Sequence, residues 1–166
     1  MTLIDIIAAI ILFFSFIGGV TQGAIKSFFS LLSFIIAIPV AGRFYSFFAD
    51  WLNFLPGQNW RNFLGFFIAL AVANVVLALI FYFPRKITEE SWDNGFISRL
   101  VGGFLNLLGA AIVLVMLALI ISAYPVWGWL QQALVDSTLI HWLVANLNFV
   151  QGLLPDILRN QVQHTF

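Results

Sequence analysis

The chain has 166 residues, of which 62% are hydrophobic and only 8% are charged, and its seven basic and seven acidic side chains give a formal net charge of zero. Soluble domains carry about a quarter charged residues, so this chain has too few polar groups to cover a water-exposed surface, and we expect an integral membrane protein surrounded by the lipid bilayer. Nucleic acid is excluded as a partner, because its binding depends on clustered Lys and Arg side chains that neutralise phosphates.

Four apolar stretches are each long enough to cross a bilayer as a helix, which takes about 20 residues. We expect these transmembrane helices near residues 3–20, 27–48, 62–83 and 100–123. The second stretch is interrupted by Pro39 and Arg43. A tilted helix is the main expectation for it, and a re-entrant hairpin is the alternative.

The tail differs from the four spans, because tryptophans and polar residues recur through it. From Ser137 to Leu154, small or polar residues recur at spacings of three and four, which places them on one face of a helix: Thr138, His141, Ala145, Asn148 and Gly152. We therefore expect an all-α protein with a four-span bundle over residues 1–124 and a C-terminal segment over residues 125–166. The amphipathic helix of that segment is expected to lie in the membrane interface or to pack across the mouth of the bundle.

Basic residues close to the span ends predict the orientation in the membrane, because cytoplasmic connections are enriched in them. The first and third connections hold Lys26, Arg85, Lys86 and Arg99, whereas the second holds Arg43 and Arg61. Both termini are therefore expected on the non-cytoplasmic side.

The polar side chains show no pattern typical of an enzyme. There is no glycine-rich phosphate loop, no nucleophile elbow and no acidic residue in the middle of a span that could relay protons or bind an ion. His141 has no metal-ligating neighbour at helical spacing, His164 is expected to be a polar surface residue like His141, and the chain contains no cysteine. We expect no catalytic residues, no metal and no cofactor.

Small residues recur on helix faces within or near the spans. They include Gly19 and Gly23, Ala37 and Ala41, and the pair Gly102 and Gly103. Small side chains let helix backbones approach closely, and in lipid this packing is a principal source of helix association. We expect these residues to pack one compact bundle and to leave further capacity for homo-oligomer formation.

Two amide side chains lie in the interior of the spans, Asn74 near the centre of the third and Asn106 in the fourth. Interhelical hydrogen bonds are the expected role of such groups in a membrane. The alternative is a polar path for a substrate, which requires both amides and Gln22 to line one cavity.

Seven residues occur in an order and spacing that is found in a known family. They are Asp5 at the start of the first span, Gly23 and Lys26 in the first connection, Ser30 in the second span, Arg99 and Gly102 at the start of the fourth, and Ser137 in the tail. This pattern resembles the colicin V production (CvpA) family of membrane proteins. Ser98 stands where that family usually has an Asp before the arginine, and Gln22 stands where it usually has an Arg.

The resemblance implies a bacterial inner-membrane protein connected with production or export of colicin V, a peptide toxin. Our first hypothesis is an accessory protein that supports toxin production, toxin export or envelope maintenance through helix packing and assembly with copies of itself or with secretion or envelope partners. The alternative is a small oligomeric transporter or channel whose path is lined by Gln22, Asn74 and Asn106.

Overall fold

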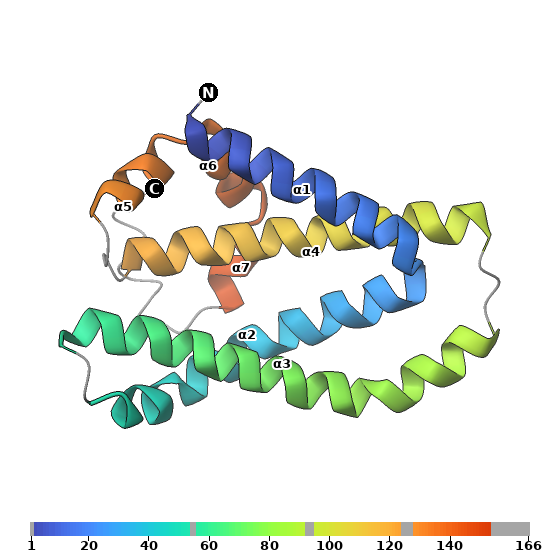
Figure 1. Cartoon of the computed structure of the whole chain (residues 1–166), viewed down its shortest axis with the longest axis horizontal. Coiled ribbons are helices and arrows are strands. Elements are labelled where there is room, and N and C mark those ends of the chain that lie inside the picture. The colour runs from blue at the N-terminus through green and yellow to red at the C-terminus, as the bar shows by residue number, and fades with distance from the viewer. Residues whose placement is uncertain (1, 54–55, 92–94, 124–127, 154–166) are drawn as a thin grey trace.

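A computed structural model describes residues 2–53, 56–91, 95–123 and 128–153 (Figure 1). This part of the chain forms helices and no strands: α1 (Leu3–Gln22), α2 (Ala24–Trp51), α3 (Gln58–Ser91), α4 (Phe96–Ala123), α5 (Gly128–Val135), α6 (Thr138–Asn146) and α7 (Asn148–Leu153). The first four are long and apolar enough to cross a membrane. The predicted all-α fold with four transmembrane helices is confirmed, whereas the domain boundary expected at residues 124 and 125 lies outside the described residues.

The second span is one continuous helix, so the re-entrant hairpin is wrong. α2 has 28 residues and runs through Pro39 without a break. Ile38 and Ala41, on either side of the proline, are fully buried. The helix continues although proline cannot donate the usual backbone hydrogen bond.

The spans lie side by side in the order α1, α4, α2 and α3 (Figure 1). α2 packs most extensively on α3, α1 packs on α4, and α4 also contacts α2. α4 is the most deeply buried span, with Ile112, Val115 and Leu119 fully buried. α1 and α3 therefore form the outer edges of the bundle, and each leaves one broad face free for lipid.

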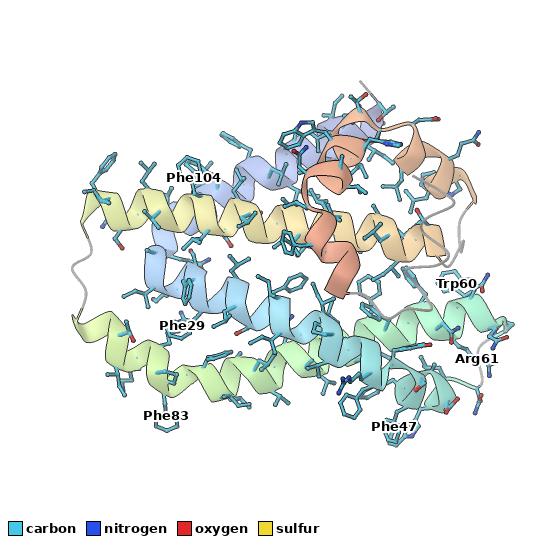
Figure 2. All side chains as sticks on the ribbon, turned by 180° about the vertical axis from the view of Figure 1, so that it is seen from behind. Phe29, Phe47, Trp60, Arg61, Phe83 and Phe104 are labelled. Carbon is cyan, nitrogen blue, oxygen red and sulfur yellow. The ribbon has the colours of Figure 1, made fainter. Side chains whose placement is uncertain are left out.

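Aromatic side chains mark both the lipid-facing surface and one end of the bundle. Phe47, Phe83 and Phe104 point away from the helices in Figure 2 and are more than half exposed. Trp60 and Arg61 lie near the start of α3, where the Arg61 guanidinium donates a hydrogen bond of 2.5 Å to the side-chain oxygen of Asn53. Such aromatic and basic residues are typical anchors at a membrane surface.

The tail forms three short helices, and the single amphipathic helix expected from Ser137 to Leu154 is divided into two of them, α6 and α7. α6 ends at Asn146 and α7 starts at Asn148, with Leu147 between them. α6 packs on α4 and α1, whereas α7 packs on α4 and α2. Each short helix buries apolar residues of its own, Ile140 on α6 and Val150 on α7.

The observed contacts agree with a tail packed across the bundle mouth. Trp142 is 63% exposed, while Leu143 beside it is buried. The expected end of the helix at Leu154 and the side chain of His164 lie outside the described residues. Placement of the segment in the membrane interface stays a prediction.

Candidate functional site

The seven residues that carry the family resemblance gather at three places along the bundle. Asp5 and Ser137 meet at the start of α1, Gly23, Lys26, Arg99 and Gly102 lie near its other end, and Ser30 lines a cavity between the two. Each of the three places is held together by a different kind of contact.

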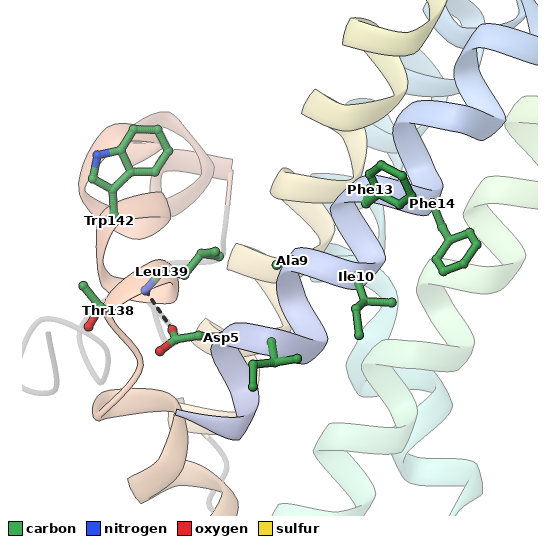
Figure 3. A pocket seen from close by; sticks show the side chains of 9 residues that line it. Asp5, Ala9, Ile10, Phe13, Phe14, Thr138, Leu139 and Trp142 are labelled. Carbon is green, nitrogen blue, oxygen red and sulfur yellow. Dashed lines mark hydrogen bonds between the residues drawn. The ribbon is translucent and has the colours of Figure 1, made fainter. Parts of the chain in front are cut away.

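The Asp5 carboxylate is the centre of the first place. It is 4% exposed, although it is a charged group. One oxygen accepts hydrogen bonds from the Ser137 hydroxyl at 2.6 Å and from the Leu139 backbone N–H at 3.0 Å, the second of which is drawn in Figure 3. The other oxygen accepts a bond of 2.6 Å from the Thr2 backbone N–H. These donors replace the water that burial removes, so the carboxylate can stay charged there.

The same carboxylate joins the starts of two helices. Asp5 and Thr2 form a capping box at the start of α1. Ser137 caps α6, because its hydroxyl oxygen accepts a hydrogen bond of 3.3 Å from the Ile140 backbone N–H. A negative charge is favoured at a helix N-terminus, and here one carboxylate serves two of them. Asp5 therefore fastens the tail to the first span across 132 positions of sequence.

An open groove of about 830 Å³ runs beside Asp5 between α1 and α6 (Figure 3). Its walls are mostly apolar and include Phe13 and Phe14 from α1 and Trp142 from α6. All three side chains are more than half exposed. Such a surface is suited to contact with lipid chains or with another apolar helix.

The second place is a crossing of helix backbones. A Cβ atom on Gly102 would lie 2.6 Å from the carbonyl oxygen of Gly19 and 2.5 Å from the carbonyl carbon of Gly23, closer than real Cβ atoms approach. A Cβ atom on Gly103 would lie 2.7 Å from a methyl carbon of Val20. Gly23 also has φ +82°, a conformation that favours glycine. The sequence at this crossing is fixed by space and backbone geometry.

The contact between α2 and α3 uses small residues as well. Ala37 and Ala41 are fully buried. Sequence reasoning missed Gly65, whose Cβ atom would lie 2.8 Å from the Ala49 backbone nitrogen. Gly65 lies four residues before the buried Ala69, so a search for small residues at this spacing could have found it.

A polar pocket of about 240 Å³ lies beside the crossing and is lined by Gln22, Lys26, Ser98 and Arg99 among others. The Ser98 hydroxyl accepts a hydrogen bond of 3.4 Å from the Ala24 backbone N–H, where α2 begins without a side-chain cap of its own. No acidic side chain among the described residues lines this pocket. Its charge is therefore positive, and it would attract anionic groups.

The third place is a cavity of about 280 Å³ between the two ends, lined by residues of all four spans. Asn74 from α3 and Asn106 from α4 both line it, whereas Gln22 lines the polar pocket near the end of α1. The structure thus brings together two of the three residues considered for a polar path. The Asn106 amide donates a hydrogen bond of 2.7 Å to the backbone carbonyl of Ser15 on α1.

One cavity residue was not predicted from the sequence at all. Ser27 on α2 lines the cavity with a buried hydroxyl that has no hydrogen-bond partner among the described residues. Nothing in the sequence distinguishes it from Ser33 on the same helix, whose hydroxyl donates a bond of 2.8 Å to the Phe29 carbonyl. Only the three-dimensional arrangement reveals the difference.

No cluster of three or more His, Cys, Asp or Glu that could hold a metal occurs within the described ranges. His141 is exposed on α6. The expectation of no catalytic residue, metal or cofactor stays a prediction.

Comparison with known proteins confirms the family that the sequence resembles. The family described as "Colicin V production protein" matches residues 4–148, which include all three places. A relative from Bacillus subtilis (strain 168), "Uncharacterized transmembrane protein YshB", is 24% identical over 173 residues that cover 93% of this chain and 97% of the relative. No solved structure matches.

Proposed function

The chain belongs to the colicin V production protein family, and from this membership we propose that it is a non-enzymatic accessory protein of the bacterial inner membrane. It supports production or export of a peptide toxin, or maintenance of the envelope, by assembling with copies of itself or with secretion or envelope proteins. The observation that carries this proposal is the crossing at Gly102, where a family-like residue is required by helix packing.

Other family-like residues also serve contacts between segments. Asp5 and Ser137 fasten the tail to α1, and Gly23 joins α1 to α2 in a single residue. An enzyme would instead gather such residues around a reactive group. A pattern that fixes the relative positions of helices is what an assembly scaffold needs.

The outer edges of the bundle provide the surfaces for assembly. α1 and α3 expose large apolar side chains along their lengths, among them Ile10 and Phe13 on α1 and Val75 and Leu79 on α3. In lipid, helices associate mainly through such close packing of side chains and backbones. α1 is the least buried of the four spans and is the first candidate to receive a partner helix.

The proposed orientation follows the basic residues. Lys26 and Arg99 line one pocket at the same end of the bundle as the connection between α3 and α4, which we assign to the cytoplasm. The Asp5–Ser137 contact then lies on the non-cytoplasmic side with both termini.

Secretion in living cells tests the accessory role. A colicin V-producing strain that lacks its own family member would be complemented with this chain, with Gly102→Leu or with Gly109→Ala as the matched control. A Cβ atom on Gly109 meets only Leu31, at 3.5 Å, an ordinary contact. We expect normal toxin secretion with the wild type and the control and loss of secretion with Gly102→Leu. Equal secretion with and without the chain would contradict the proposal.

The copy number provides a second measurement. The protein extracted into native nanodiscs would be weighed by mass spectrometry, which reports copies of the chain, bound partners and retained lipid together. An oligomer or a complex with another envelope protein is expected. A bare monomer would contradict assembly.

Transport is the second candidate, and one observation favours it: Asn74 and Asn106 line the same cavity. A path would have to continue from this cavity to Gln22 in the polar pocket and requires several copies of the chain. The test is Asn74→Leu in a flux or secretion assay. Transport predicts loss of activity in a folded protein, whereas the accessory role predicts no change.

A further inference from the structure

We propose that the cavity between the four spans is a binding site for a small uncharged molecule that carries both hydrogen-bond donors and acceptors, as a polyol such as glycerol does. Part of the cavity wall is polar although it lies among transmembrane helices: Ser15, Ser27, Ser30, Asn74 and Asn106 line it together with apolar residues. This inference depends neither on the accessory role nor on transport, because it rests only on the chemistry of the cavity.

The first observation is the unpartnered hydroxyl of Ser27. The residue is 1% exposed, and the hydroxyl has no partner among the described residues. A serine in a helix can bond to the carbonyl of the preceding turn, as the 5% exposed Ser33 does with Phe29. Burial of a polar group without a hydrogen bond is costly, above all in a membrane, where no bulk water can reach it. A ligand in the cavity would supply the missing partner.

The second observation concerns the hydrogen bonds of the two amide side chains, Asn74 and Asn106. The Asn74 side chain is half-buried and makes no hydrogen bond to a described residue. The Asn106 amide donates to the Ser15 carbonyl, which leaves its side-chain oxygen as an acceptor. An amide contributes both donors and an acceptor, and a serine hydroxyl contributes one donor and two lone pairs. The cavity is therefore complementary to a molecule that can donate and accept.

The uncharged lining and the volume of the cavity restrict the class of ligand that it can bind. None of the described residues that line the cavity is charged. An ion in this place would lack a compensating charge, so an uncharged ligand is favoured. The volume of about 280 Å³ equals that of roughly nine liquid water molecules, which is enough for a small polyol. The cationic Lys26 and Arg99 line a different pocket.

The chain contains no cysteine, so a single introduced thiol can be probed without background. Ser27→Cys would be prepared in lipid nanodiscs and treated with methyl methanethiosulfonate, a small uncharged reagent that reacts with a thiolate to form a mixed disulfide. Ser33→Cys is the matched control, because Ser33 is buried on the same helix but does not line the cavity. Glycerol is the ligand probe, and Thr138→Cys on the exposed surface of α6 corrects for its general effect on the reaction.

We expect Ser27→Cys to react at least tenfold faster than Ser33→Cys, and molar glycerol to slow Ser27→Cys several-fold beyond its effect on Thr138→Cys. Addition of Asn74→Leu should remove most of this protection. Equal rates at the two buried positions would overturn the proposal, because the cavity would then be closed to polar molecules. Fast reaction without specific protection by glycerol would also overturn it, since the cavity would hold water only. Ser30→Cys, in the same cavity, replaces Ser27→Cys if the latter does not fold.

Discussion

The two ends of α1 are held by different physical means. At its start, Asp5 accepts directional hydrogen bonds from Ser137 and Leu139 of the tail. Near its end, Gly19 lies against Gly102 of α4 so closely that no side chain fits between the backbones. Hydrogen bonds can be exchanged with water one at a time, whereas close packing is lost as a whole when one atom is inserted. The bonded end can therefore release the tail while the packed end keeps the spans together.

The largest effect is expected where the packed end is broken. Gly102→Ala adds a Cβ atom between two backbones that cannot move apart without separating α1 from α4. We expect a loss of about 2–3 kcal/mol in the free energy of unfolding, the upper part of the usual range for overpacking. Denaturation in detergent micelles measures it. Gly109→Ala on the same helix is the control and should be neutral or slightly stabilising, because its Cβ atom has room.

The next effect concerns the bonded end. Ser137→Ala removes the hydroxyl that donates to Asp5 and caps α6, which should weaken attachment of the tail by about 1–2 kcal/mol. Limited proteolysis should cut residues 128–153 faster, while the four spans stay protected. Thr138→Ala, at the exposed neighbouring position, should leave the cleavage rate unchanged. If the spans themselves become sensitive in Ser137→Ala, the two ends are not independent.

A smaller effect is expected from the hydrogen bond between α4 and α1. Asn106→Leu removes the bond to the Ser15 carbonyl, and such bonds in membranes contribute about 0.6 kcal/mol on average and up to about 1.7 kcal/mol. Asn74→Leu, which removes an amide without a described partner, should cost nothing or stabilise the protein. Both values can be measured by unfolding in the same micelles. A larger loss in Asn74→Leu would show that Asn74 is the structural amide.

The smallest effect is expected from a stronger hydrogen-bond acceptor at position 98, near the packed end of α1. Ser98→Asp restores the acidic residue that the family usually has there, at the start of α2, where the Ser98 hydroxyl already accepts a hydrogen bond from the Ala24 backbone N–H. A carboxylate caps a helix N-terminus well and would face Lys26 and Arg99 in the polar pocket. We expect a gain of about 0.3–1 kcal/mol that shrinks at high salt. Ser98→Asn, which caps without charge, is the control and should show no salt dependence.

The spans could be predicted because lipid makes the sequence unusually informative. A segment in hydrocarbon must satisfy its backbone hydrogen bonds internally, so each long apolar run has to be a helix. This requirement does not determine the structure of the tail. Its periodicity correctly indicated helix, but no local pattern marks the break at Leu147 between α6 and α7.

Individual residues of the candidate site could be predicted from the sequence, but the contacts between them could not. Asp5 and Ser137 were both identified, yet their contact spans 132 positions and cannot be deduced from one sequence. Gly102 was expected to pack, but its closeness to Gly23 depends on the angle at which α1 and α4 cross. Ser27 was missed because a serine without a partner looks like any other serine until its surroundings are known.

The order of the spans across the bundle also determines when the contacts between them can form during synthesis of the chain. α1 is synthesised before the other spans, but the helix on which it packs is α4, and even the α2–α4 contact beside the end of α1, from Ala24 to Ser98, closes only 74 residues later. At about 5–20 residues per second, that interval lasts roughly 4–15 s. During it, the glycine face of α1 is open to any helix nearby in the membrane. During this short period, another membrane protein can bind the surface of α1 that α4 later covers.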